Sequence, residues 1–138
     1  MRPGTPRTGA PTMAFVALVT LLALGLYVVL TAHAAYRRGK GKVAAPATTG
    51  EENFERALRI QLNTAEQLLL FLPAMWLAGL YASWGWAGFL GLVWIGARAF
   101  YAWSYQRAPA SRGPGFILGL TAAMTLWLIA LIGVLFNL

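Results

Sequence analysis

The chain has 138 residues, of which 59% are hydrophobic and only 11% are charged. Soluble domains carry about a quarter charged residues, so this composition excludes an ordinary water-exposed globule and favours an integral membrane protein. The net charge of +7 would suggest nucleic acid in a soluble protein, but most basic residues here flank apolar runs, so we expect no nucleic-acid partner. With no cysteine, no aspartate and a single histidine, His33, we expect no metal site.

The apolar runs predict four membrane-spanning helices, because a hydrocarbon core about 30 Å thick takes roughly 20 apolar residues of helix. The uncharged run over 67–97 is too long for one span, and 81–86 offers a turn with tryptophans suited to the membrane interface. Residues 39–50 have the composition of a linker. We therefore predict an all-α, up-down bundle in one domain, 1–138, with helices at about 12–37, 52–81, 86–107 and 114–136.

The basic residues predict the orientation of these helices. The turn after the second helix and the C-terminus carry none, whereas the ends of the first and third loops carry Arg37, Arg38, Lys40, Lys42, Arg107 and Arg112. The positive-inside rule places these two loops in the cytoplasm and both termini on the opposite side. Arg2 and Arg7 weaken this bias without reversing it, and with the apolar run after them they leave open a cleaved signal peptide, which would leave three spans.

A polar stripe enters the membrane on the second predicted helix. Arg59, Asn63 and Glu66 lie at i, i+4 and i+7, so they share one face of that helix. An ionised group at membrane depth costs several kcal/mol unless it is paired or hydrated, which makes the stripe a candidate functional site. The alternative is a structural Arg59–Glu66 pair, with Asn63 joining helices by hydrogen bonds.

The third predicted helix supplies a matching face. Arg98, Tyr101 and Tyr105 fall at i, i+3 and i+7, and Arg107 and Arg112 follow. Tyrosines and arginines at a helix end are often interface anchors and topology signals. Because both stripes lie at the predicted cytoplasmic ends of their helices, they can also converge on one cavity. Such a cavity suits an anionic polar ligand at one end and a lipophilic ligand at the other.

The residues of 54–66, 71–79 and 91–105 resemble the MAPEG family, the membrane-associated proteins in eicosanoid and glutathione metabolism. The likeness covers about residues 13–136 and is closest to the branch of leukotriene C4 synthase, the microsomal glutathione S-transferases and the five-lipoxygenase-activating protein. The Arg-x-x-x-Asn-x-x-Glu core and the tyrosines of the third helix carry it. The resemblance implies a homotrimer with sites between neighbouring subunits, and glutathione bound at the cytoplasmic side as a cosubstrate.

Carried over position by position, the resemblance makes Arg112 the candidate catalytic residue, which stabilises the glutathione thiolate. It also implies glutathione contacts from Arg38, Arg59, Gln61, Asn63, Glu66, Tyr101 and Tyr105. A free thiol has a pKa of about 8.5, and a nearby guanidinium, which stays protonated, favours the thiolate. Gln67 departs from the family pattern, because the synthase has a tyrosine there.

We therefore predict a membrane-bound glutathione transferase, with glutathione peroxidase activity also open. Its thiolate would attack a lipophilic electrophile or a lipid hydroperoxide that reaches the site from the membrane lipids. A non-catalytic lipid-binding or scaffold protein of the same fold is the alternative, and a purely structural bundle is a third possibility. Small residues at 111, 115 and 119 permit close helix packing at the start of the fourth helix.

Overall fold

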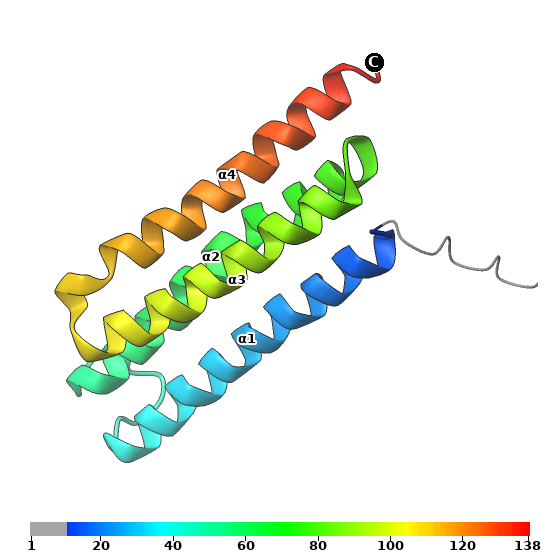
Figure 1. Cartoon of the computed structure of the whole chain (residues 1–138). Coiled ribbons are helices and arrows are strands. Elements are labelled where there is room, and N and C mark those ends of the chain that lie inside the picture. Colours follow the sequence, from blue (N-terminus) through cyan, green and yellow to red (C-terminus); the bar gives the residue numbers. More distant parts are fainter. Residues whose placement is uncertain (1–10) are drawn as a thin grey trace, which may run out of the picture.

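The computed structural model describes residues 11–138, and this part of the chain folds into four long α-helices that run alternately up and down (Figure 1). The elements are α1 (Met13–Lys40), α2 (Glu52–Tyr81), α3 (Trp84–Arg107), a 3₁₀ helix η1 (Pro109–Ser111) and α4 (Gly113–Leu135). α2 and α3 lie together in the middle of the bundle, with α1 and α4 on opposite flanks. The predicted all-α bundle of four helices is therefore confirmed for the described residues. Arg2 and Arg7 lie outside them.

The helix bounds differ from the predicted ones at several ends. α1 continues beyond residue 37 to Lys40, and its last turn holds Arg37 and Arg38, whose charges suit the negative end of the helix dipole. α3 begins at Trp84 rather than 86, because the Ser83 hydroxyl accepts a hydrogen bond from the Trp86 N–H at 3.3 Å and caps the helix. η1 was not predicted, and α4 is displaced by one residue at each end.

The start of α2 is fixed by a carboxylate cap. Glu51 accepts hydrogen bonds from the backbone N–H groups of Asn53 at 3.0 Å and Phe54 at 2.8 Å. These two bonds hold the pKa of the Glu51 carboxyl below its ordinary value. The cap therefore sets where the helix begins.

Aromatic and small residues build the interior. The rings of Phe71 on α2 and Trp94 on α3 stack with their centroids 4.1 Å apart. On α4, a Cβ added at Gly115 would lie 2.8 Å from the backbone N and Cα of Tyr101, so the two helix backbones are in direct contact there. The small-residue motif of α4 is thus used within the chain, to bring α4 against α3 beside the polar stripes.

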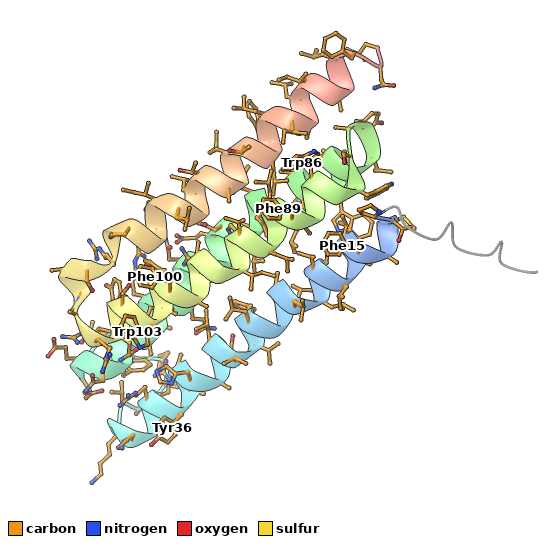
Figure 2. All side chains as sticks on the ribbon, in the orientation of Figure 1. Phe15, Tyr36, Trp86, Phe89, Phe100 and Trp103 are labelled. Carbon is orange, nitrogen blue, oxygen red and sulfur yellow. The ribbon has the colours of Figure 1, made fainter. Side chains whose placement is uncertain are left out.

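The outer surface of the bundle is apolar. Large side chains such as Leu21, Leu69 and Ile117 are more than half exposed. Aromatic residues gather at both ends of the bundle: Figure 2 shows Phe15, Trp86 and Phe89 toward one end, and Tyr36, Phe100 and Trp103 toward the other. An apolar belt with aromatic residues at its two edges is the pattern expected of a protein in a bilayer.

Two helical segments among residues 11–138 are long and apolar enough to cross a membrane: Met13–Lys40 and Pro109–Leu135. α2 and α3 have sufficient length, with 30 and 24 residues, but neither contains a stretch as apolar as those in these two segments. The segments Met13–Lys40 and Pro109–Leu135 support membrane insertion. That all four helices span the membrane stays a prediction.

Candidate functional site

A cavity of about 320 Å³ lies between α2, α3 and α4, at the end of the bundle that carries the α1–α2 and α3–α4 connections. Four of the predicted site residues line it, from three different helices or their ends. The full lining is Arg59, Asn63, Tyr101, Arg112, Gly113 and Phe116. The polar stripes of α2 and α3 therefore meet at one cavity, and α4 closes it with the apolar ring of Phe116.

The α2 wall combines a guanidinium and an amide, with a carboxylate next to them. Arg59 is exposed and Asn63 is half-buried one turn further along the helix. The Asn63 Nδ2 donates a hydrogen bond to the Glu66 Oε2 at 3.3 Å, which holds the carboxylate beside the lining rather than within it. The cavity thus has a cationic mouth with a carboxylate next to it.

Arg98 supports this wall from behind. Its side chain is fully buried, and its Nη2 donates to the Asn63 Oδ1 at 3.0 Å and to the Thr64 Oγ1 at 2.8 Å. Its guanidinium carbon also lies 4.0 Å from the centroid of the Tyr101 ring. Because Arg98 engages the amide oxygen of Asn63, the Nδ2 of that residue can only donate, with one hydrogen to Glu66 and the other available to a ligand.

Sequence reasoning placed Arg98 on this face of α3 but gave it no role. The available signal was an arginine in the middle of an apolar helix, where a charge persists only with partners. Thr64, which accepts from Arg98 and donates to the Ile60 carbonyl oxygen at 2.8 Å, was also missed.

The α3 and α4 walls bring two phenols and a second arginine together. Tyr101 and Tyr105 are both buried, and their ring centroids lie 5.7 Å apart. Arg112, the residue between η1 and α4, is exposed, and its Nη1 donates to the Tyr105 hydroxyl oxygen at 3.4 Å. Tyr105 therefore holds Arg112 at the rim of the cavity without itself lining it.

Two predicted residues lie elsewhere in the same chain. The Arg38 Nη1 donates to the Ala47 carbonyl oxygen at 2.7 Å, and its guanidinium lies 4.4 Å from the centroid of the Phe54 ring. The Gln61 Nε2 donates to the Thr31 Oγ1 of α1 at 3.3 Å. A single chain therefore does not bring Arg38 and Gln61 into the lining of the cavity.

Gln67, which departs from the family pattern, is a core residue. It is 7% exposed, and its Oε1 accepts a hydrogen bond from the Trp94 Nε1 at 3.0 Å. Its amide thus serves the contact between α2 and α3. Over residues 11–138, no group of three or more His, Asp or Glu side chains is placed to hold a metal ion.

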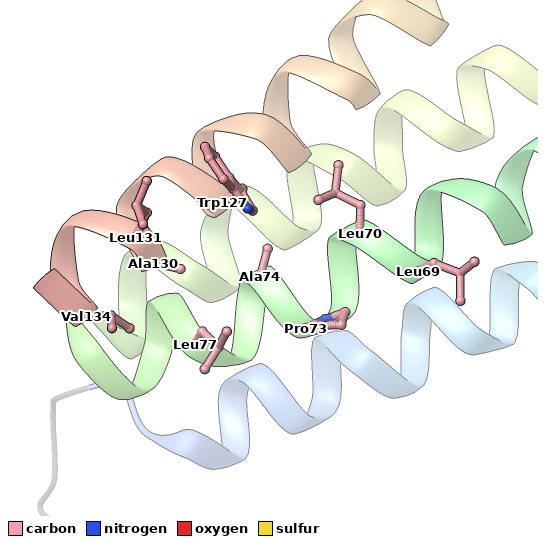
Figure 3. Close-up of a pocket in the computed structure, with 9 residues that line it drawn as sticks. All are labelled: Leu69, Leu70, Pro73, Ala74, Leu77, Trp127, Ala130, Leu131 and Val134. Carbon is pink, nitrogen blue, oxygen red and sulfur yellow. The ribbon is translucent and has the colours of Figure 1, made fainter.

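An apolar groove of about 340 Å³ lies between α2 and α4, further along these helices than the polar cavity (Figure 3). Leu70, Ala74 and Leu77 form its α2 side, and Trp127 and Leu131 belong to its α4 side. The α2–α4 face of the chain is thus polar at the end with the connecting loops and apolar further along.

These features define an all-helical membrane protein with a polar site at one end of its bundle. The family model for MAPEG matches residues 16–132, and the chain belongs to the MAPEG family.

Three relatives are informative. The chain is 47% identical over 122 residues to an uncharacterized protein of Synechocystis sp., covering 88% of this chain and 89% of that one. It is 40% identical over 97 residues to human microsomal glutathione S-transferase 2, covering 70% of this chain and 66% of that protein. It is 36% identical over 118 residues to leukotriene C4 synthase of Cavia porcellus, covering 85% of this chain and 76% of that protein. The predicted family resemblance is confirmed.

Proposed function

We propose that the chain is a membrane-bound glutathione transferase, whose cavity holds glutathione and activates its thiol. The observation that carries this proposal is the arrangement of two guanidiniums, an amide and a buried phenol around one cavity, from Arg59, Arg112, Asn63 and Tyr101. Its support from the comparisons is the similarity to a glutathione S-transferase and to leukotriene C4 synthase.

The cavity offers complementary partners for the charged groups of glutathione. Arg59 at the open side suits one of the two carboxylates, because a guanidinium binds a carboxylate through two parallel hydrogen bonds. The Asn63 Nδ2 is a donor for a second carboxylate or a carbonyl oxygen. Glu66, beside the lining, suits the α-amino group. These assignments orient the peptide with its thiol toward the rim at Arg112.

Arg112 is proposed as the catalytic residue. A guanidinium within hydrogen-bond distance of the thiol lowers its pKa from about 8.5 and raises the thiolate fraction at neutral pH. In the transferase reaction the thiolate sulfur forms a bond to the electrophilic carbon, the leaving group departs with its electron pair, and the thiol proton passes to solvent. With a hydroperoxide, the thiolate attacks the terminal oxygen to give an alcohol and a sulfenic acid, which a second glutathione converts to the disulfide and water.

The apolar groove between α2 and α4 is the proposed site for the lipophilic substrate. It lies on the same face as the polar cavity and is lined by leucine, alanine and tryptophan side chains (Figure 3). A lipophilic electrophile from the bilayer would place its apolar part there and its reactive atom toward Arg112.

We further propose a homotrimer in which a neighbouring subunit completes each cavity. Arg38 and Gln61 lie outside the lining within one chain, so their contribution to glutathione binding requires a second copy. We also propose that the cavity faces the cytoplasm, because its end of the bundle carries the basic loops.

Glutathione binding and conjugation of a chlorinated nitroaromatic, measured on the detergent-solubilised protein, test the proposal. We expect the parent to bind and turn over, and Arg112→Ala to lower turnover at neutral pH by up to about tenfold for each unit by which the thiol pKa rises, because the thiolate fraction falls by that factor. Lys40→Ala is the matched control, because it removes an exposed cation at the same end of the bundle, outside the cavity.

The outcomes separate the candidate functions. Absence of glutathione binding in the parent would overturn the transferase proposal. Binding without turnover of nitroaromatic or hydroperoxide substrates would instead support a lipid-binding or scaffold protein. Equal losses of turnover in Arg112→Ala and Lys40→Ala would contradict the catalytic role of Arg112.

A further inference from the structure

A second cavity near the basic end of the bundle lies outside the proposed glutathione site. Its volume is about 370 Å³, and it is lined by Leu30, His33, Ile60, Ala102, Trp103, Gln106 and Arg107. It shares no lining residue with the cavity of Arg59 and Arg112. On α3, successive side chains are about 100° apart, so Ala102, Trp103 and Gln106 point to a different side of the helix from Tyr101. The two cavities therefore open on different faces of the bundle.

This second cavity has an apolar floor and a polar, cationic rim. Leu30 and Ile60 form the floor and are 7% and 2% exposed. Arg107, the last residue of α3, is exposed at the rim, and its guanidinium carbon lies 4.8 Å from the centroid of the Trp103 ring. His33 adds a polar imidazole from α1, and no acidic side chain of the described chain is part of this lining.

The wall beside Arg107 is held in place by contacts with α2. The Gln106 Nε2 donates to the Asn53 carbonyl oxygen at 3.2 Å, and the Gln106 carbonyl oxygen accepts from the Arg56 Nη1 at 3.1 Å. Arg56 in turn forms an ion pair with Glu52. The rim is therefore built on anchored backbone, although the Arg107 side chain itself is exposed.

The aromatic residues around this cavity indicate the depth at which it would lie in a bilayer. Trp103 is 56% exposed and lies with Phe100 toward the end of the bundle where α1 carries Tyr36 (Figure 2). Exposed tryptophan and tyrosine side chains sit at the membrane–water interface, where a charged headgroup lies above its acyl chains. The floor then faces the acyl region, and Arg107 faces the headgroup.

We propose that this cavity binds one anionic phospholipid. Its phosphate would pair with Arg107, with the imidazole of His33 nearby, and the first part of an acyl chain would lie over Leu30 and Trp103. Charge complementarity selects this occupant, because the cationic rim contains no carboxylate to balance Arg107 and the whole chain carries a net charge of +7. The site is independent of the proposed transferase activity, since it uses none of its residues.

Native mass spectrometry of the full-length protein released from nanodiscs tests the proposal. The nanodiscs contain equal amounts of phosphatidylglycerol and phosphatidylcholine with the same acyl chains. We expect one retained phosphatidylglycerol per chain in the parent, and a roughly fivefold loss in Arg107→Gln, because one surface cation contributes about that factor to anionic lipid binding. Lys42→Gln, which removes an exposed loop cation outside the cavity, should keep the parent value.

A second variant addresses the shape of the cavity rather than its charge. Ala102→Phe places a ring into the lining from a partly exposed position and should also lower phosphatidylglycerol retention. An unchanged unfolding temperature in both cavity variants would show that the fold is intact.

Three results would overturn the proposal. Equal loss in Arg107→Gln and Lys42→Gln would show only general attraction to a basic surface. Equal retention of the two lipids in the parent would show an apolar groove without headgroup recognition. A change of oligomeric state in Arg107→Gln would show that this face contacts another subunit.

Discussion

The fully buried guanidinium of Arg98 is the residue on which the arrangement of the polar cavity depends most. Removing such a group from water costs several kcal/mol unless its donors are engaged. Here Asn63 and Thr64 accept hydrogen bonds from its Nη2 and the Tyr101 ring covers its face, whereas its buried Nε and Nη1 have no hydrogen-bond partner among residues 11–138. The same contacts fix the amide of Asn63 and the ring of Tyr101, both of which line the cavity. Arg98 is thus a positioning residue, one layer behind the groups proposed to touch glutathione.

Replacing Arg98 should affect glutathione binding more than it affects folding. Arg98→Met leaves the half-buried Asn63 Oδ1 and the buried Thr64 Oγ1 without their donor, at a cost of about 1–3 kcal/mol, but it also removes a buried charge, which offsets part of that cost. We expect glutathione affinity, measured by calorimetry, to fall roughly tenfold, as for the loss of one well-placed hydrogen bond to a ligand. Arg98→Lys should restore part of it.

A control variant on the same pair of helices separates loss of glutathione affinity from general destabilisation of the fold. Arg56→Gln breaks the contact with the Gln106 carbonyl oxygen and should lower the unfolding temperature while leaving glutathione affinity unchanged. If Arg56→Gln and Arg98→Met reduced affinity alike, the loss would reflect general destabilisation, and the positioning role would be wrong.

At the scale of the elements, the close approach of α3 and α4 sets the position of the Arg112 end of the cavity. Gly115 lies against the backbone of Tyr101, and Gly119 faces the side chains of Arg98 and Gln67. The chain from Arg112 to Phe116 begins α4 and also lines the cavity. Any displacement of α4 from α3 therefore moves Arg112 relative to the residues of α2.

Gly115→Ala should both destabilise the protein and lower turnover. Its Cβ would lie 2.8 Å from backbone atoms of Tyr101, which cannot rotate away, and overpacking of this kind costs about 1–3 kcal/mol. Gly96→Ala on α3 is the matched control, because its Cβ would meet nothing within 4 Å, and alanine favours a helix over glycine by up to about 1 kcal/mol. Thermal unfolding and conjugation assays of both variants check this. Full activity in Gly115→Ala would contradict the proposed link between helix contact and site.

The sequence could predict which residues share a face of one helix, but not which faces of different helices meet. Helical periodicity places Arg59, Asn63 and Glu66 on one face of α2 whatever the rest of the fold, because 3.6 residues per turn is a local property. Which faces dock against each other depends on contacts between distant segments. The partners of Arg98 therefore emerged only from the packed helices, and the position of Arg38 depends on how the α1–α2 loop folds back onto it.

At the scale of the whole molecule, the apolar outer surface and the separation of Arg38 from the cavity are both consistent with association of several copies of the chain. A bundle with such a surface is suited to lipid contact and to contact with copies of itself. The cavity of one chain holds Arg59 but not Arg38. The trimer proposed above would bring these two arginines from different chains to one glutathione.

Subunit mixing tests this sharing of the site. Arg59→Ala and Arg38→Ala should each lose most glutathione turnover alone. When the two variants are co-expressed, a mixed trimer with shared sites contains one intact site, with Arg59 from one chain and Arg38 from its neighbour. We therefore expect partial recovery of turnover in mixed trimers isolated with two different affinity tags. Recovery would be absent if each site belonged to a single chain.

The central claim, that Arg112 holds glutathione as a thiolate in this cavity, is tested most directly by a pH titration of the thiolate ultraviolet absorbance of protein-bound glutathione. The parent should show a midpoint below the free-thiol pKa of about 8.5, because the guanidinium favours the charged form. Arg112→Ala should move that midpoint upward, so that thiolate forms only at higher pH. A parent whose bound glutathione titrates as free thiol, or an Arg112→Ala variant with an unchanged midpoint, would contradict the account.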